Sequence, residues 1–237
     1  MLKDILFALV VGGGGWCLAL FLFAMLLRLI SGEPLINRPK EEKPKKFIVD
    51  YGKLSFRLLN IKNHKSLLNK VPYRILFDDM AMCLNAKTEN EEDRLITFDE
   101  YRKDMWFSAD NTAPSIDPPV LESLTESMRK HARNLIFDEM LMVEDNMFVL
   151  TNKAHRYGAS ALFYVGVQKK LYKLFGEYYA LPTSVHSWMI IPVLDGNESE
   201  REFLKNKVRE DNKKLPREEV LSNNLYYFGG KELEVMN

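Results

Sequence analysis

An uncharged N-terminal segment constrains this chain more than any other feature. From Ile5 to Leu27 no residue carries a charge. At about 1.5 Å rise per residue, a helix of this length is about 34 Å long, and the hydrocarbon core of a bilayer is about 30 Å thick. A cleaved signal peptide is the main alternative, but its apolar stretch is shorter, and no Ala-x-Ala cleavage site follows here. We therefore expect one transmembrane α-helix within residues 1–30, in contact with the lipid bilayer through residues 5–27.

Basic residues flank this expected helix unequally. Only Lys3 precedes it, whereas Arg28 and a group of Lys and Arg up to Lys46 follow it. Because Lys and Arg beside a membrane helix remain on the cytoplasmic side, we expect a single-pass protein of the cell membrane with its N-terminus outside and its C-terminal domain in the cytoplasm. Prolines within residues 31–46 favour an extended, charged linker before that domain.

Small residues lie on one face of the expected membrane helix: Ala8, Gly12, Gly15 and Ala19. Such a stripe allows two helices to approach closely, so it predicts a packing face for self-association or for a protein partner in the membrane. Glycine is also common in membrane helices, and this gives the stripe a plainer interpretation.

Residues 47–237 have the length of a single globular domain with its own core. Their acidic residues slightly outnumber their basic ones, so we expect no nucleic acid as a partner. Cys17 lies in the expected membrane helix and Cys83 in the domain, which makes an intrachain disulfide implausible and agrees with a reducing compartment. No Cys/His pattern has zinc spacing, so we expect no metal and no cofactor.

Strand and helix patterns alternate irregularly along the domain. Apolar alternation or short apolar runs predict strands at residues 53–60, 73–84, 95–96, 147–151, 178–181, 188–194 and 225–228. Helical spacing and capping residues predict helices at residues 64–70, 98–106, 117–132, 160–175 and 198–214, with a loop at 108–119. Residues 135–143 fit either element. Short connections between strands predict an α+β fold, mainly an antiparallel sheet with packed helices.

Several short motifs follow one another in the C-terminal half of the chain. They are Met147-Phe-Val-Leu-Thr-Asn-Lys153, Gly158-Ala-Ser160, Tyr179-Ala-Leu-Pro-Thr-Ser-Val-His186 and Glu219-Val-Leu-Ser-Asn-Asn-Leu-Tyr-Tyr227. Over residues 50–228 the chain resembles an uncharacterised bacterial family that is known only as a domain of unknown function. The resemblance implies one α+β domain and no particular reaction. Family members usually have an acidic residue where this chain has Ser187, and most of them look soluble.

His186 is the strongest single candidate for chemistry. A neutral imidazole at the start of a strand could act as a base, but a structural hydrogen bond within a hairpin is the plainer interpretation. Cys83 could be a nucleophile beside it, although its apolar surroundings favour a buried, inert thiol. Asp78 and Asp79 would point to opposite faces of the expected strand, which argues against a metal site.

A polar loop precedes the expected helix at residues 160–175. Lys153, Arg156 and Ser160 are residue types that hold an anion together with the free amides of a helix start. An N-cap with Gly158 at positive φ would give the same pattern without a ligand.

Two functions from different classes fit these patterns. The favoured one is a membrane-anchored protein whose cytoplasmic domain is an interaction or scaffold module, because no set of catalytic residues converges in the sequence. The alternative is an anion-binding enzyme or hydrolase that uses His186 with Lys153 or Arg156. The alternative requires these residues to meet around a pocket.

Overall fold

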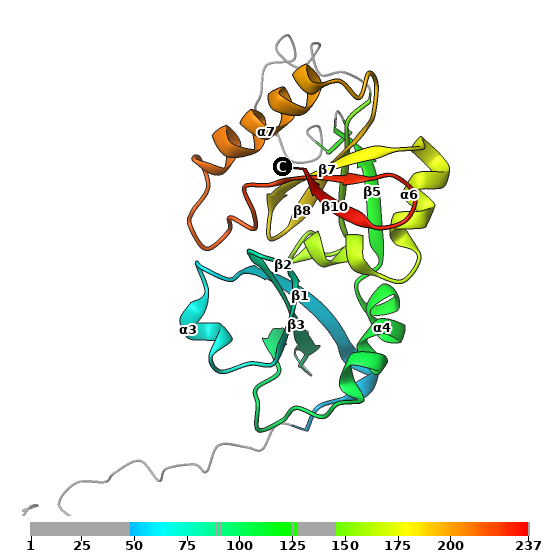
Figure 1. The fold of residues 1–237 in the computed structure, drawn as a ribbon. Helices are drawn as coiled ribbons and strands as arrows, with labels where there is room; N and C mark the ends of the chain where they lie inside the picture. Colours follow the sequence, from blue (N-terminus) through cyan, green and yellow to red (C-terminus); the bar gives the residue numbers. More distant parts are fainter. Residues whose placement is uncertain (1–47, 89, 91, 125, 128–145, 237) are drawn as a thin grey trace, which may run out of the picture. The chain divides into compact units, whose positions relative to one another are not determined.

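Two antiparallel sheets with packed helices make up the computed structural model (Figure 1). The structure describes residues 48–88, 90, 92–124, 126–127 and 146–236. The two antiparallel sheets and the packed helices confirm the predicted α+β class. The expected membrane helix, its linker and the packing face at Ala8, Gly12, Gly15 and Ala19 lie outside the described residues, as do residues 135–143. Within the described residues, no helix is both long enough and apolar enough to cross a bilayer.

The N-terminal sheet is built around its central strand β3. Its strands are β1 (Leu54–Asn60), β2 (Tyr73–Phe77), β3 (Met80–Lys87) and β4 (Asp93–Leu95), in the order β1-β3-β2 with β4 also paired to β3. Helix α4 (Met105–Ile116) covers one face, where Trp106 stacks on Phe56 at 6.0 Å between ring centroids. The short helix α3 (Lys65–Leu68) packs on the opposite face through Leu68, which contacts a cluster that includes Leu59. Side chains on both faces of β1 and β3 are therefore buried, whereas Tyr73, Arg74 and Ile75 of β2 are exposed.

Asp78 and Asp79 form the turn between β2 and β3, so the single strand expected at residues 73–84 is wrong. Aspartate favours turns because its short side chain bonds to nearby backbone groups. The two carboxylates therefore do not project from opposite faces of one strand. Asp79 instead accepts a hydrogen bond from the hydroxyl of Ser222 at 2.8 Å.

Helix α4 occupies most of the segment for which the sequence predicts a loop, and the helix expected at residues 98–106 begins only at Met105. Ser, Asp, Asn and Pro in this segment favour a loop locally. Helical spacing nevertheless places Trp106, Ala109 and Ala113 on one buried face against β1. Burial of that face outweighs the weak local preference, and Pro114 is accommodated near the end of the helix.

The C-terminal sheet has six strands in the order β10-β9-β7-β8-β6-β5, all antiparallel. The strands are β5 (Pro119–Ser123), β6 (Phe148–Asn152), β7 (Tyr178–Ser184), β8 (Ser187–Pro192), β9 (Leu225–Phe228) and β10 (Leu233–Met236). The sequence prediction of β6, β7, β8 and β9 is confirmed, while β10 was not expected. Where the sequence predicts the start of a helix at residues 117–132, β5 pairs with β6 instead.

Helices cover both faces of the C-terminal sheet. Helix α7 (Glu198–Asn212) confirms the prediction at residues 198–214 and packs Leu204 and Val208 on one face. The helix expected at residues 160–175 is split into a 3₁₀ helix, η3 (Gly158–Phe163), and α6 (Val167–Phe175). The break ends at Gly166, which has a φ of +81° that favours glycine. Gly176 ends α6.

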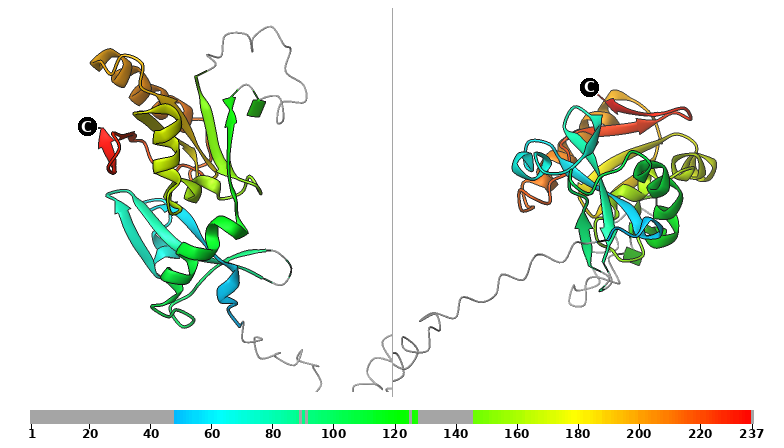
Figure 2. Two further views of the ribbon diagram at one scale, coloured as in Figure 1. Left: turned by 90° about the vertical axis from the view of Figure 1, so that its right-hand side faces the viewer. Right: turned by 90° about the horizontal axis from the view of Figure 1, so that it is seen from below.

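Polar contacts join the two sheets. Figure 2 shows the ribbon of both sheets in two further views. The side-chain amide of Asn60 donates to the carbonyl of Leu221 at 3.0 Å. Ser222 donates to Asp79 at 2.8 Å and accepts from Tyr226 at 2.9 Å. Ser222 is fully buried. The segment between α7 and β9, which contains Leu221 and Ser222, therefore attaches the C-terminal sheet to the N-terminal one through these hydrogen bonds.

Candidate functional site

His186 lies in the tight turn between β7 and β8. Ser184 and Ser187 are paired across this turn, and only Val185 and His186 lie between them. The backbone N–H of His186 donates to the hydroxyl of Ser184 at 3.0 Å, and its carbonyl accepts from Thr151 at 2.8 Å. These contacts fix the backbone of His186 against β6, so the imidazole has a defined position.

The imidazole of His186 accepts a hydrogen bond from the backbone N–H of Tyr157, with 2.9 Å between nitrogen and Nδ1. An amide N–H can only donate, so Nδ1 is unprotonated and Nε2 carries the proton of the neutral ring. Burial lowers the pKa of His186 below its usual value of 6.5, Glu219 raises it, and Arg156 and Arg57 lower it. In this arrangement His186 presents an N–H donor at Nε2 and has no free lone pair there to act as a base.

The loop that supplies Tyr157 has an unusual backbone. His155 and Tyr157 both have a φ of +52°, a region that non-glycine residues seldom adopt. The side chain of Asn152 closes the loop, since it accepts from the N–H of Arg156 at 3.1 Å and donates to the carbonyl of Arg156 at 2.9 Å. Backbone strain of this kind persists only where the surroundings enforce it, and it is concentrated at functional sites.

Gly158 allows this loop to approach the hairpin. A Cβ at Gly158 would lie 2.3 Å from Oγ1 of Thr151 and 2.7 Å from the carbonyl oxygen of His186. No other residue fits so close to these atoms, because real Cβ atoms do not come within 3.0 Å of them. Glycine is therefore required at residue 158 for close approach, whereas the sequence predicted a glycine at positive φ.

Tyr157 stands between two guanidinium groups and the imidazole. The guanidinium carbon of Arg57, from β1, lies 3.6 Å from the centre of the Tyr157 ring, and that of Arg156 lies 5.6 Å from it. The rings of Tyr157 and His186 are 5.3 Å apart between centroids. We call Arg57, Arg156, Tyr157 and His186 the Tyr157 cluster.

Arg57 is held rigidly within this cluster. Its Nη2 donates to Oδ1 of Asn85 at 3.1 Å, and the amide of Asn85 in turn donates to Asp93 at 3.0 Å. The Nε of Arg57 is buried without a hydrogen-bond partner in the described part of the chain. A buried N–H without an acceptor costs free energy, and the packing that fixes Arg57 over Tyr157 has to offset this cost.

The structure brings together three of the residues that the sequence singled out. Arg156, Ser160 and His186 all surround Tyr157, since the buried hydroxyl of Ser160 donates to the carbonyl of Tyr157 at 3.2 Å. Ser160 therefore supports the loop from inside. Lys153 is exposed, and its backbone N–H bonds to Pro118 next to β5 at 2.9 Å.

Cys83 is buried in β3, directly opposite Arg57 in the pairing of β1 with β3. Burial raises the pKa of this thiol to about 12, although Arg57 acts in the opposite direction. The thiol is therefore protonated at neutral pH and is a poor nucleophile. Among the described residues, no group of three or more His, Cys, Asp or Glu side chains is placed to hold a metal ion.

Sequence reasoning missed Arg57 and Tyr157 as members of the site. Arg57 is the one charged residue of β1, and the other residues of this strand are all buried, so that contrast was a usable signal. Tyr157 gives no comparable signal, because only the folded chain shows its left-handed backbone and its contact with His186.

The fold and the cluster define an α+β domain of two antiparallel sheets with a cationic, aromatic site at the β7–β8 turn. A model of a family of unknown function, DUF5688, matches residues 36–229, so the chain belongs to this family. The expected membership of a family of unknown function is thus confirmed. No curated protein and no solved structure matches the chain.

Proposed function

We propose that this chain is a membrane-anchored binding module whose domain recognises an anionic group of a partner protein at the Tyr157 cluster. The observation that carries the proposal is the bond from the Tyr157 N–H to Nδ1 of His186, beside two guanidinium groups. It makes the imidazole a neutral donor among cations. Three donor groups that face one aromatic ring suit a carboxylate or a phosphate.

Binding is favoured over turnover by the state of the groups that would have to react. A general base needs a free lone pair within reach of the substrate, and the lone pair of His186 is already engaged by Tyr157. Cys83 is held in its thiol form by burial. The alternative function, a hydrolase that uses His186 with Lys153 or Arg156, would require the Tyr157–His186 bond to break first.

Arg57 and Arg156 contribute differently to the proposed recognition. Arg57 is partly buried and fixed by Asn85 and Tyr157, so little side-chain entropy remains to be lost on binding. Arg156 is exposed and is the first cation that an approaching anion meets. A fixed inner cation and an accessible outer one favour an acidic side chain presented by a partner surface.

The uncharged segment at residues 5–27 supports the membrane anchor and a location at the cell membrane with the domain in the cytoplasm. Tethering at a membrane confines the domain and its partners to one surface, which raises their effective concentration. A weak anion site is then sufficient for a scaffold. The small-residue face at Ala8, Gly12, Gly15 and Ala19 would add self-association within the bilayer.

The proposal is tested with the full chain in membranes and with a chain that lacks residues 1–46. We expect the full chain to remain in the membrane fraction after a high-salt wash, and the shortened chain to be released. For recognition, the full chain in detergent is titrated with a fluorescent glutamate-rich peptide. Arg156→Ala should weaken binding about threefold to tenfold, which corresponds to the loss of one exposed charged contact.

Lys153→Ala is the matched control, since it removes an exposed cation three residues away and should change the affinity less than twofold. Equal effects of both substitutions would show general charge attraction and would contradict a site at the Tyr157 cluster. Hydrolysis of an aryl ester or aryl phosphate that is lost in His186→Asn would establish the enzyme instead.

A further inference from the structure

A basic cavity lies at the C-terminal end of α7, and none of its lining residues belongs to the Tyr157 cluster. Its volume is about 560 Å³, which is within the usual range of small-molecule sites, about 300–1,000 Å³. Three cationic and three amide side chains line it together with two aliphatic ones; the polar ones are Arg209, Lys213, Arg217, Asn63, Asn212 and Asn223. No carboxylate is among the lining residues.

Hydrogen bonds of two asparagines fix the walls of this basic cavity. Asn212, only 7% exposed, donates to the carbonyl of Ser222 and to Oδ1 of Asn223, both at 2.8 Å. Asn63 donates to the carbonyl of Arg217 at 2.9 Å and accepts from Nε of Arg217 at 3.1 Å. The segment that follows α7 is thus held from both sides, and the guanidinium of Arg217 is oriented before any ligand arrives.

Several nitrogen atoms that line the basic cavity can donate hydrogen bonds to a ligand. Arg217 uses only Nε, so both of its terminal nitrogens are available. Asn223 uses only its oxygen, so its amide nitrogen is available. Within the described part of the chain, neither these nitrogens nor those of Arg209 hydrogen-bond to protein. Lys213 bonds to Glu210 at 2.6 Å, but both side chains are largely exposed, and such a pair is exchanged at little cost.

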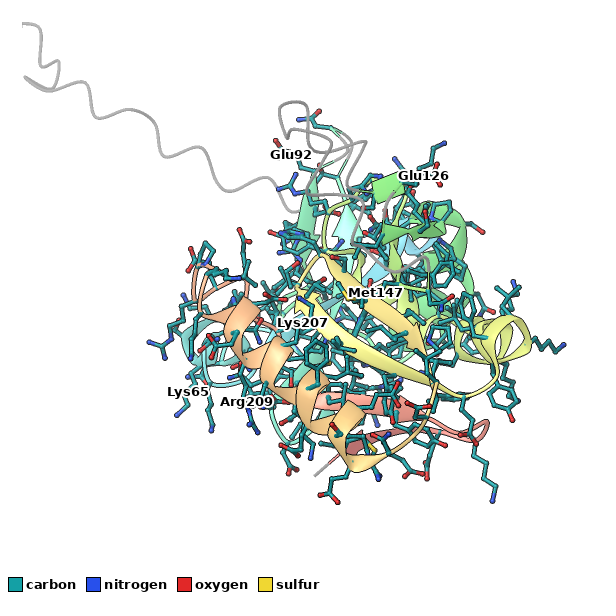
Figure 3. All side chains as sticks on the ribbon, turned by 90° about the horizontal axis from the view of Figure 1, so that it is seen from above. Lys65, Glu92, Glu126, Met147, Lys207 and Arg209 are labelled. Atoms are coloured by element: carbon teal, nitrogen blue, oxygen red, sulfur yellow. The ribbon has the colours of Figure 1, made fainter. Side chains whose placement is uncertain are left out.

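The dipole of helix α7 accounts for some of the cationic side chains that line the basic cavity. Cations near the C-terminal end of a helix are favoured by its dipole, and this accounts for Lys213 and in part for Arg209. The dipole does not account for Arg217, which lies beyond the end of α7 and is turned into position by Asn63 from the N-terminal half. Figure 3 shows the side chain of Arg209 projecting from α7, with Lys207 on another side of the same helix.

We propose that this basic cavity binds a small phosphorylated molecule with a hydroxyl-bearing body, such as a sugar phosphate. Two guanidinium forks suit the several oxygens of a phosphate dianion better than a single carboxylate. A bare phosphate would leave most of the cavity empty, and the amide of Asn223 suits a hydroxyl group of the remaining body. The slightly acidic domain disfavours a long polyanion such as a nucleic acid.

The test uses the full chain in detergent with glucose 6-phosphate as the probe, followed by isothermal titration calorimetry. Glucose and inorganic phosphate are the comparison arms. We expect the sugar phosphate to bind more tightly than either arm. Arg217→Ala and Arg209→Ala should each weaken its binding about tenfold, which is the loss of one charged hydrogen-bonding contact. Arg217→Lys should restore binding only in part, since a lysine lacks the fork.

Lys207→Ala is the matched control because Lys207 is on the same helix, about 200° around it from Arg209, and pairs with Asp211 at 2.8 Å. It should leave the affinity unchanged. No binding of glucose 6-phosphate, or equal binding by Arg217→Ala with unchanged circular dichroism, would overturn the site. Equal affinity for inorganic phosphate would overturn the hydroxyl-bearing body. Arg156→Ala should not affect the binding of glucose 6-phosphate. The experiment therefore distinguishes failure of the proposed basic cavity from failure of the proposed Tyr157 cluster.

Discussion

At the scale of single residues, the state of His186 makes a prediction about pH. Burial lowers its pKa below 6.5 in the folded chain, so the unfolded chain binds a proton more readily. Stability from this group is therefore complete above about pH 6.5 and falls as the pH drops toward the lowered folded pKa. His186→Asn keeps an acceptor for Tyr157 but does not titrate. The stability advantage of the natural chain over this variant should therefore shrink between pH 7.5 and pH 5.

Urea unfolding at both pH values measures this difference. Residues 49–237 form one compact unit, so a chain without residues 1–46 is suitable. All other groups are common to both chains, so their contributions cancel in the comparison. An advantage of the natural chain that stays constant across the pH range would show that the pKa of His186 is not lowered.

Sequence reasoning selected only part of the Tyr157 cluster. Sequence reasoning selected His186 and Arg156 because a histidine after a loop and a basic loop before a helix are local patterns. Arg57 is far from both in the chain, and its position over Tyr157 depends on how β1 meets the loop before η3. No periodicity or spacing encodes a contact of that kind.

At the scale of elements, helix α7 carries its own start signal. Oδ1 of Asn197 accepts from the N–H of Glu200 at 2.8 Å, and the Glu200 carboxylate accepts from the N–H of Gly196 at 2.8 Å. This resembles a capping box, and it is encoded within a few residues. Asn197→Ala should lower the free energy of unfolding by about 1 kcal/mol, as measured in urea, because an N–H at the helix start loses its acceptor.

Asn197→Asp supplies the same acceptor and should stay within about 0.5 kcal/mol of the natural chain. If alanine were tolerated as well as aspartate, the cap would have no energetic role. The contrast with α4 is instructive, because α4 has no side-chain cap bond and its residues favour a loop. Helix α7 was thus predicted from the sequence, whereas α4, which depends on burial of one face against β1, was not.

At the scale of the whole molecule, Ser222 joins the two sheets. Its hydroxyl donates to Asp79 in the β2–β3 turn and accepts from Tyr226 in β9. Ser222→Ala would leave buried polar groups on both sides without their partner, and we expect a loss of about 1–2 kcal/mol. Hydrogen exchange followed by mass spectrometry should show faster exchange in β3 and in β9 together, since both strands lose the same contact.

Ser66→Ala is the control for this prediction, because Ser66 is exposed on α3 and its loss should cost less than about 0.5 kcal/mol. Faster exchange confined to β9 would mean that the sheets are stabilised independently of each other. In that case the polar contacts at Asp79 would be incidental to the fold.

The sequence by itself determined the α+β class, the antiparallel hairpin of β7 and β8, the helix α7 and the family. Each of these depends on patterns that span a few neighbouring residues, such as apolar alternation, capping and chain punctuation by glycine. Only the tertiary structure decided that residues 105–116 form a helix, that residues 119–123 form a strand, and that Arg57 meets Tyr157 and His186. The physical reason is that burial and hydrogen bonding between distant segments outweigh local preferences of a few tenths of a kcal/mol per residue.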